Sequence, residues 1–168
     1  MVFKLVLGDW SNDGHGICRE ILFDCNYDLK TIQEGYRKSS KNLNIAFDTN
    51  AKYTEPKLKY GSDRHVWTDY QDSGISTEAF EVLRANNCFK NVCTESELDE
   101  IIKENIDDGN DEKYYFDFDS EKCAIVIMNF IAVSMPDDFT YTIVEEDIPA
   151  INGYWGDLNV QFGYGLYD

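Results

Sequence analysis

Residues 2–25, V-F-K-L-V-L-G-D-W-S-N-D-G-H-G-I-C-R-E-I-L-F-D-C, carry the pattern from which the fold class can be read. Two apolar-rich runs, Val2–Leu7 and Glu20–Cys25, flank a polar stretch that is rich in glycine. In the second run the residues that share one side of an extended strand are apolar, namely Ile21, Phe23 and Cys25. The dipeptide Asp13-Gly14 favours a tight hairpin turn. The segment therefore predicts an antiparallel β-hairpin.

The same polar stretch fits the twelve-residue template of a calcium-binding loop, D-x-[DNS]-x-[DN]-G-x5-E. Its ligands would be a backbone carbonyl at position seven and side chains at positions one, three, five and twelve: Asp9, Ser11, Asp13, His15 and Glu20. Calcium is the one cofactor that the sequence suggests. However, Met1–Leu7 is too short and too β-branched to form the helix that precedes such a loop. A polar hairpin loop is therefore the competing interpretation.

Length and composition favour one folded domain over residues 1–168. The chain has 43% hydrophobic and 14% aromatic residues, which is enough for a core in spite of a formal net charge of -17. We expect an α+β fold with a mainly antiparallel sheet and about three helices. No internal repeat or low-complexity linker divides the chain.

The three helices are predicted from their capping residues and apolar spacing. Asp28 caps a helix that ends in the polar stretch 38–42, and Ser76 precedes the helical pattern T-E-A-F-E-V-L-R-A. Thr94 begins a capping box, with Glu97 three residues later. The predicted strands follow or separate these helices: Leu43–Phe47, Tyr114–Phe118, Cys123–Val133, Phe139–Val144 and Leu158–Phe162. Cys123–Val133 is expected to be a buried central strand, since it is far shorter than the roughly 20 residues that cross a bilayer. Residues 48–63 are polar, contain Pro56 and are expected to form a long loop.

Charge is distributed unevenly along the chain. Residues 28–64 are slightly basic, whereas residues 95–121 hold twelve acids against two lysines, and no Lys or Arg follows Ser134. Such acidity disfavours direct nucleic-acid and membrane binding and favours contact with a basic surface. Our leading hypothesis is therefore an acidic cytoplasmic protein-protein interaction module that engages a basic partner surface. An acidic, well-solvated surface with no binding role is the alternative.

The C-terminal segment 151–168 combines aromatic residues, acids and glycines without any cation. Its candidate partner-binding residues are Tyr154, Trp155, Asp157, Tyr164 and Tyr167, because aromatic side chains lose little entropy when they form an interface. A terminal strand that buries the same rings is the alternative interpretation.

A metal-dependent hydrolase is a third functional hypothesis. Asp117 and Asp119 would share one face of a strand about 6.6 Å apart, close enough to need a neutralising cation. The signatures of P-loop, dinucleotide-binding, serine hydrolase and zinc protease families are absent from the sequence, so whether the protein is an enzyme is left open. The five cysteines are odd in number and lack paired C-x-x-C spacing, which predicts reduced thiols and a cytoplasmic location.

Overall fold

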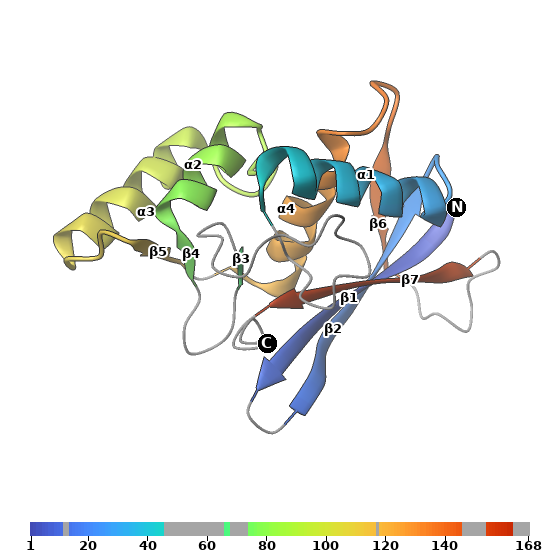
Figure 1. Cartoon of the computed structure of the whole chain (residues 1–168), viewed down its shortest axis with the longest axis horizontal. Helices are drawn as coiled ribbons and strands as arrows, with labels where there is room; N and C mark the ends of the chain where they lie inside the picture. Colours follow the sequence, from blue (N-terminus) through green and yellow to red (C-terminus); the bar gives the residue numbers. More distant parts are fainter. Residues whose placement is uncertain (12–13, 46–65, 68–73, 117, 146–153, 163–168) are drawn as a thin grey trace.

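A computed structural model describes residues 1–11, 14–45, 66–67, 74–116, 118–145 and 154–162. Within these ranges the chain forms an α+β fold with four helices and two sheets, which confirms the predicted fold class (Figure 1). The larger sheet and helices α1 and α4 lie toward one end of the molecule. Helices α2 and α3 lie toward the other end, beside the small sheet (Figure 1).

The larger sheet has four strands in the order β6-β2-β1-β7. Strands β1 (Val2–Ser11) and β2 (Gly14–Cys25) pair antiparallel, and so do β2 and β6 (Tyr141–Val144). Strand β7 (Tyr154–Phe162) pairs parallel with β1. The sheet is therefore mainly antiparallel, as expected, with one parallel pair at its edge.

The predicted N-terminal hairpin is confirmed, and its strands extend further than the two apolar runs. Phe3 pairs with Phe23 and Leu5 pairs with Ile21, so alternate residues of both strands face the core. The register shifts between Leu7 and Gly8, where the ladder is irregular.

Helix α1 (Leu29–Leu43) begins where the sequence predicts. The Asp28 carboxylate accepts a hydrogen bond from the Thr31 N–H at 2.8 Å, which satisfies one free donor of the first turn. Hydrogen bonding by the Thr31 side chain and then by its backbone N–H lowers the pKa of Asp28. The helix runs beyond the predicted end, and Asn44 terminates it in the left-handed conformation (φ 54°). The predicted strand Leu43–Phe47 is thus wrong at its start, because Leu43 is helical. Residues 46–47 and the predicted loop 48–63 lie outside the described residues.

The close approach of α1 to α4 and to Met135, which follows α4, explains the glycine within α1. A Cβ atom at Gly35 would lie 2.6 Å from Met135 Sδ and 3.3 Å from Ile131 Cγ2. A larger residue at this position would clash with the side chains of Met135 and Ile131, which would have to move. Glycine weakens a helix, and here the packing compensates for that cost.

Helices α2 (Thr77–Ala85) and α3 (Glu95–Asp107) are both confirmed, with Ser76 and Thr94 as their N-caps. They flank a three-stranded sheet in the order β3-β4-β5, formed by β3 (Val66–Trp67), β4 (Gly74–Ser76) and β5 (Lys113–Tyr115). Strand β5 covers only the first part of the predicted strand Tyr114–Phe118.

The prediction of a central strand at Cys123–Val133 is wrong, because this run forms helix α4 (Ser120–Ala132). Asp119 caps it by accepting a hydrogen bond from the Lys122 N–H at 2.8 Å. Most of its residues are buried, so apolar side chains occur on nearly every side and the helical period of amphipathic helices is lost.

Side chains of α4 join the two ends of the molecule through one connected core. Asn129 Nδ2 donates to the carbonyls of Cys88 (2.9 Å) and Lys90 (2.8 Å), and its Oδ1 accepts from the Tyr141 hydroxyl (2.6 Å). A single amide thus ties the turn between α2 and α3 to strand β6. None of the helices in the described ranges is long and apolar enough to cross a membrane.

Candidate functional site: the acidic surface of α3

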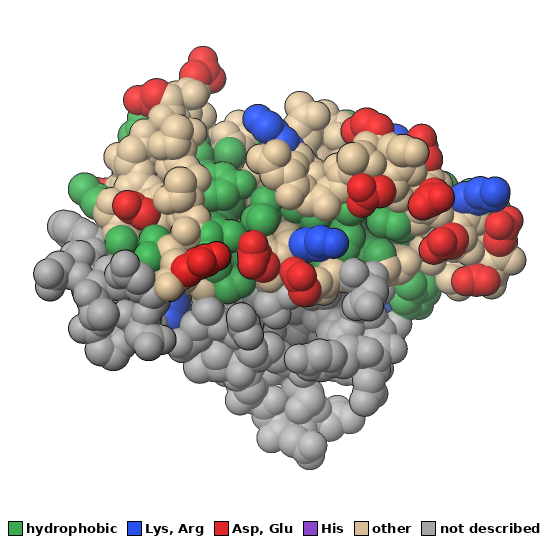
Figure 2. Space-filling model, turned by 180° about the vertical axis from the view of Figure 1, so that it is seen from behind, with side chains coloured by type: hydrophobic (Ala, Val, Ile, Leu, Met, Phe, Trp, Pro, Cys, Tyr) green, Lys and Arg blue, Asp and Glu red, His purple; other side chains and the backbone are tan. Residues whose placement is uncertain are grey.

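The acids of residues 95–121 lie on the surface rather than in internal ion pairs. Every described acid of this zone is exposed. These residues lie on α3, in the turns after it and at the start of α4, and we call them the α3 acidic surface: Glu95, Glu97, Asp99, Glu100, Glu104, Asp107, Asp108, Asp111, Glu112, Asp119 and Glu121. Red side chains crowd the end of the molecule that α3 occupies, with few blue ones between them (Figure 2). The uneven charge of the sequence therefore becomes a concentrated surface.

Helical spacing brings four of these acids onto one side of α3. Glu97, Glu100, Glu104 and Asp108 follow one another at intervals of three or four residues. Each neighbouring pair of like charges at this spacing destabilises a helix by about 0.2–0.5 kcal/mol. The last turn of α3 contains no basic residue, so its acids also oppose the helix dipole. The arrangement thus lowers the stability of α3.

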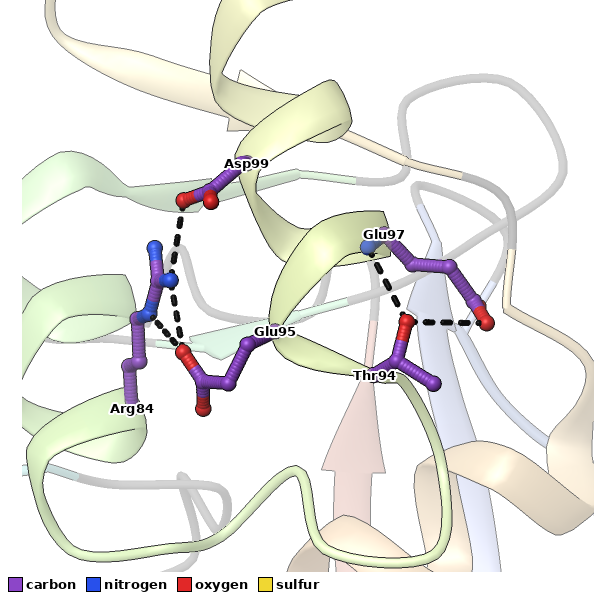
Figure 3. Close-up of polar contacts among 5 residues, drawn as sticks. All are labelled: Arg84, Thr94, Glu95, Glu97 and Asp99. Atoms are coloured by element: carbon purple, nitrogen blue, oxygen red, sulfur yellow. Dashed lines mark hydrogen bonds and ion pairs between the residues drawn. The ribbon is translucent and has the colours of Figure 1, made fainter.

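One cation is held on this surface by the fold itself (Figure 3). Arg84, at the end of α2, donates from Nε and Nη2 to Glu95 Oε2 at 2.9 and 2.6 Å, and from Nη2 to Asp99 Oδ1 at 2.9 Å. These bonds raise the pKa of the Arg84 guanidinium. This bridge could not be predicted from the sequence, because Arg84 and its two partners lie on different helices at a spacing that has no local signature.

The first turn of α3 is stabilised by Thr94, the predicted capping residue (Figure 3). Its hydroxyl oxygen accepts from the Glu97 N–H at 3.1 Å and donates to the Glu97 carboxylate at 3.2 Å. The acids near this end favour the helix dipole, so the unfavourable charge is confined to the middle and the end of α3.

The calcium candidates fall in the paired strands of the hairpin. Asp9 pairs with Gly16, and Glu20 pairs with Val6. Glu20, at loop position twelve, lies opposite Val6, which is three residues from Asp9 at loop position one. The two positions are thus about 10 Å apart along the strands. This pairing favours the hairpin over a loop that wraps around an ion. Ser11 and His15 also lie in the ladder, and Asp13 is outside the described residues. Calcium binding stays a prediction, which calorimetry on the intact protein and on Glu20→Gln would test.

Two further sets of predicted residues are only partly placed. The backbones of Tyr154, Trp155 and Asp157 lie in edge strand β7, whereas Tyr164 and Tyr167 are outside the described residues. Of the proposed hydrolase pair, Asp119 is the N-cap of α4 rather than a strand residue, and Asp117 is not described. Among the residues that the structure describes, no group of three His, Cys, Asp or Glu side chains could hold a metal ion.

The four described cysteines have free thiols. Cys25, Cys88 and Cys123 are buried and Cys93 is half-buried. Burial raises the pKa of Cys25 to about 12 and that of Cys88 to about 12. Partial burial, together with the nearby carboxylate of Glu97, raises the pKa of Cys93. The thiols of Cys25, Cys88 and Cys93 are therefore protonated at neutral pH and are weak nucleophiles.

In comparisons with known proteins, the chain matches no family model, no curated protein and no solved structure.

Proposed function

We propose that this protein is an interaction module that engages a basic protein surface through the α3 acidic surface. The main support is that the acids of α3 are exposed, that four of them (Glu97, Glu100, Glu104 and Asp108) follow one side of the helix, and that those near its C-terminal end oppose its dipole. Departures from local stability rules are expected at functional sites. A partner that brings Lys or Arg side chains would relieve the repulsion and so gain affinity.

Concentrated charge of one sign mainly raises the rate at which partners of opposite charge associate and determines which partners are selected. Such a surface attracts cationic proteins over several ångströms and repels nucleic acids and other acidic proteins. Free thiols fit a reducing compartment, so we place this function in the cytoplasm. The C-terminal residues Tyr154, Trp155, Asp157, Tyr164 and Tyr167 stay a separate prediction of a partner-binding set.

The test is a capture experiment from native lysate at rising salt concentration. Glu100→Gln combined with Glu104→Gln removes two charges from α3, and Glu34→Lys on the distant helix α1 changes net charge by the same amount. We expect wild type and the α1 variant to retain the same basic proteins, and the α3 variant to lose them.

The salt dependence of capture tests whether the contact is electrostatic. The captured proteins should elute as the ionic strength rises, because the Debye length falls from about 8 Å at physiological salt to about 3 Å at 1 M. Capture that is insensitive to salt, or equal for the α3 and α1 variants, would rule out recognition by the α3 acidic surface.

A further inference from the structure

Strand β6 lies at one end of the larger sheet, with β2 on one side (Figure 1). The hydrogen bonds of Thr140 show how its backbone is oriented. Thr140 C=O accepts from Asn26 N–H at 3.4 Å, and Thr140 N–H donates to Asn26 Oδ1 at 3.0 Å. Since successive residues of a strand point their backbone groups to opposite sides, Thr142 also faces β2. Tyr141 and Ile143 therefore direct their N–H and C=O groups away from the sheet.

The hydrogen bonds between β2 and β1 independently give the same orientation for the backbone of β6. Cys25 N–H donates to the carbonyl of Met1 at 2.8 Å, so the backbone of Cys25 faces β1. Its neighbour Asp24 must then face β6, where the register places it opposite Thr142. The outward direction of alternate β6 residues thus rests on two separate sets of bonds.

The outward edge of β6 differs from that of the small sheet. At β5, Asn105 Nδ2 donates to the Tyr115 carbonyl at 2.9 Å and its Oδ1 accepts from the Tyr115 N–H at 2.7 Å. This buried amide occupies the edge as a neighbouring strand would. At β6, no strand among the described residues pairs with the outward groups. An edge of this kind is a template for an added strand.

Acidic residues precede and follow β6 in the chain, and they indicate what kind of added strand would bind there. Asp137 and Asp138 precede it and Glu145 follows it, all exposed, and Glu146 and Asp147 come next in the sequence. The loop that leads into β6 projects from the body and carries acidic side chains at its tip (Figure 2). A second copy of the chain would bring its own acids against these, so self-pairing is opposed by charge.

We propose that β6 binds an extended segment of a partner protein as an additional strand, with β-branched or apolar residues along Tyr141–Val144 and Lys or Arg at both ends. The backbone of the segment bonds the outward groups of Tyr141 and Ile143, and its cations meet the flanking acids. This surface is separate from α3, so the inference does not depend on the α3 acids.

The probe is a peptide of alternating threonine and valine with two lysines at each end. One control peptide is N-methylated at every central residue, which keeps its charge and side chains but removes its backbone donors. A second control replaces the lysines with glutamates. We expect saturable binding of the probe, with the amides of Tyr141 and Ile143 protected from hydrogen exchange in NMR spectra, and binding about tenfold weaker for the methylated peptide.

Two protein variants separate the backbone from the charge. Ile143→Pro removes an outward N–H while leaving the bonds to β2 in place, since proline is tolerated where a strand's N–H faces away from its neighbour. Asp137→Lys with Glu145→Lys reverses the flanking charge. Both should weaken probe binding, whereas Glu104→Lys on α3 should leave it unchanged.

Equal binding of the methylated and unmethylated peptides to wild type would overturn strand addition, even if Ile143→Pro failed to fold. Changes in the NMR signals of α3 without changes at β6 would also overturn it. In that case the function proposed for the α3 acidic surface would still stand. Loss of lysate capture by the α3 variant together with intact peptide binding at β6 would support both proposals.

Discussion

Reversing one charge in the middle of the α3 acidic surface should stabilise the protein. Glu104 has an acid one turn before it, Glu100, and another one turn after it, Asp108. Each like-charge pair at this spacing costs about 0.2–0.5 kcal/mol, and an opposite pair gains a similar amount. Glu104→Lys converts two repulsive pairs into two attractive ones and places a cation near the helix C-terminus. We therefore expect a gain of about 1–2 kcal/mol in the free energy of unfolding.

The matched control is Glu34→Lys in α1, which makes the same chemical change at another exposed helical position. Glu34 lies one turn from Lys30 and one turn from Lys38. Its reversal turns two attractive pairs into repulsive ones, so stability should fall by about 1 kcal/mol. The two variants have equal net charge and opposite predicted effects, which separates local geometry from total charge.

Urea denaturation at low salt, followed by the same measurement at about 1 M NaCl, is the assay. High salt should shrink both effects, because the charges are exposed and screened. Changes of the same sign in both variants would refute the reasoning, since total charge rather than spacing would then govern stability. A gain for Glu104→Lys that persists at high salt would show that its origin is not electrostatic.

Three other outcomes are expected from the packing and the buried groups. Asn129→Leu should lower the free energy of unfolding by about 2–3 kcal/mol in urea titrations, because two carbonyls and a tyrosine hydroxyl lose their partner. Gly35→Leu should cost about 1–3 kcal/mol by overpacking, and an unchanged melting temperature would contradict the close approach of α1 to the segment after α4. The contribution of three buried groups to stability should be constant below pH 9 and fall between pH 9 and about 12, because burial raises the pKa values of Cys25 and Cys88 from 9.0, and that of Tyr141 from 10.0, to about 12. The unfolded chain loses these protons first, so a melting temperature that stays level up to pH 11 would argue against their burial.

Features that depend on neighbouring residues were predictable from the sequence. Asp28, Ser76 and Thr94 cap their helices with bonds to residues three positions later, and such bonds need no tertiary contact. The hairpin follows from alternation and a turn dipeptide in one short segment. The uneven distribution of acids is likewise a property of the chain, and the structure adds only that the described acids of residues 95–121 are exposed.

The error at α4 has a physical cause. A run that is apolar at nearly every position can be a buried strand or a buried helix, since neither shows a polar face. The Asp119 cap was present in the sequence, but the alternating aromatic residues before it suggested that the strand continued. Burial on nearly all sides comes from the surrounding core, which no local pattern describes.

By itself, the sequence determined the α+β class, the helix starts, the N-terminal hairpin and the concentration of acids, because all of these depend on residues close together in the chain. Only the tertiary structure decided that β7 runs parallel to β1, that Arg84 bridges Glu95 and Asp99, and that Tyr141 and Ile143 turn their backbone groups outward. These contacts join residues that are distant in sequence or belong to different elements. Their partners are chosen by the packing of the whole core, and a local pattern cannot encode that choice.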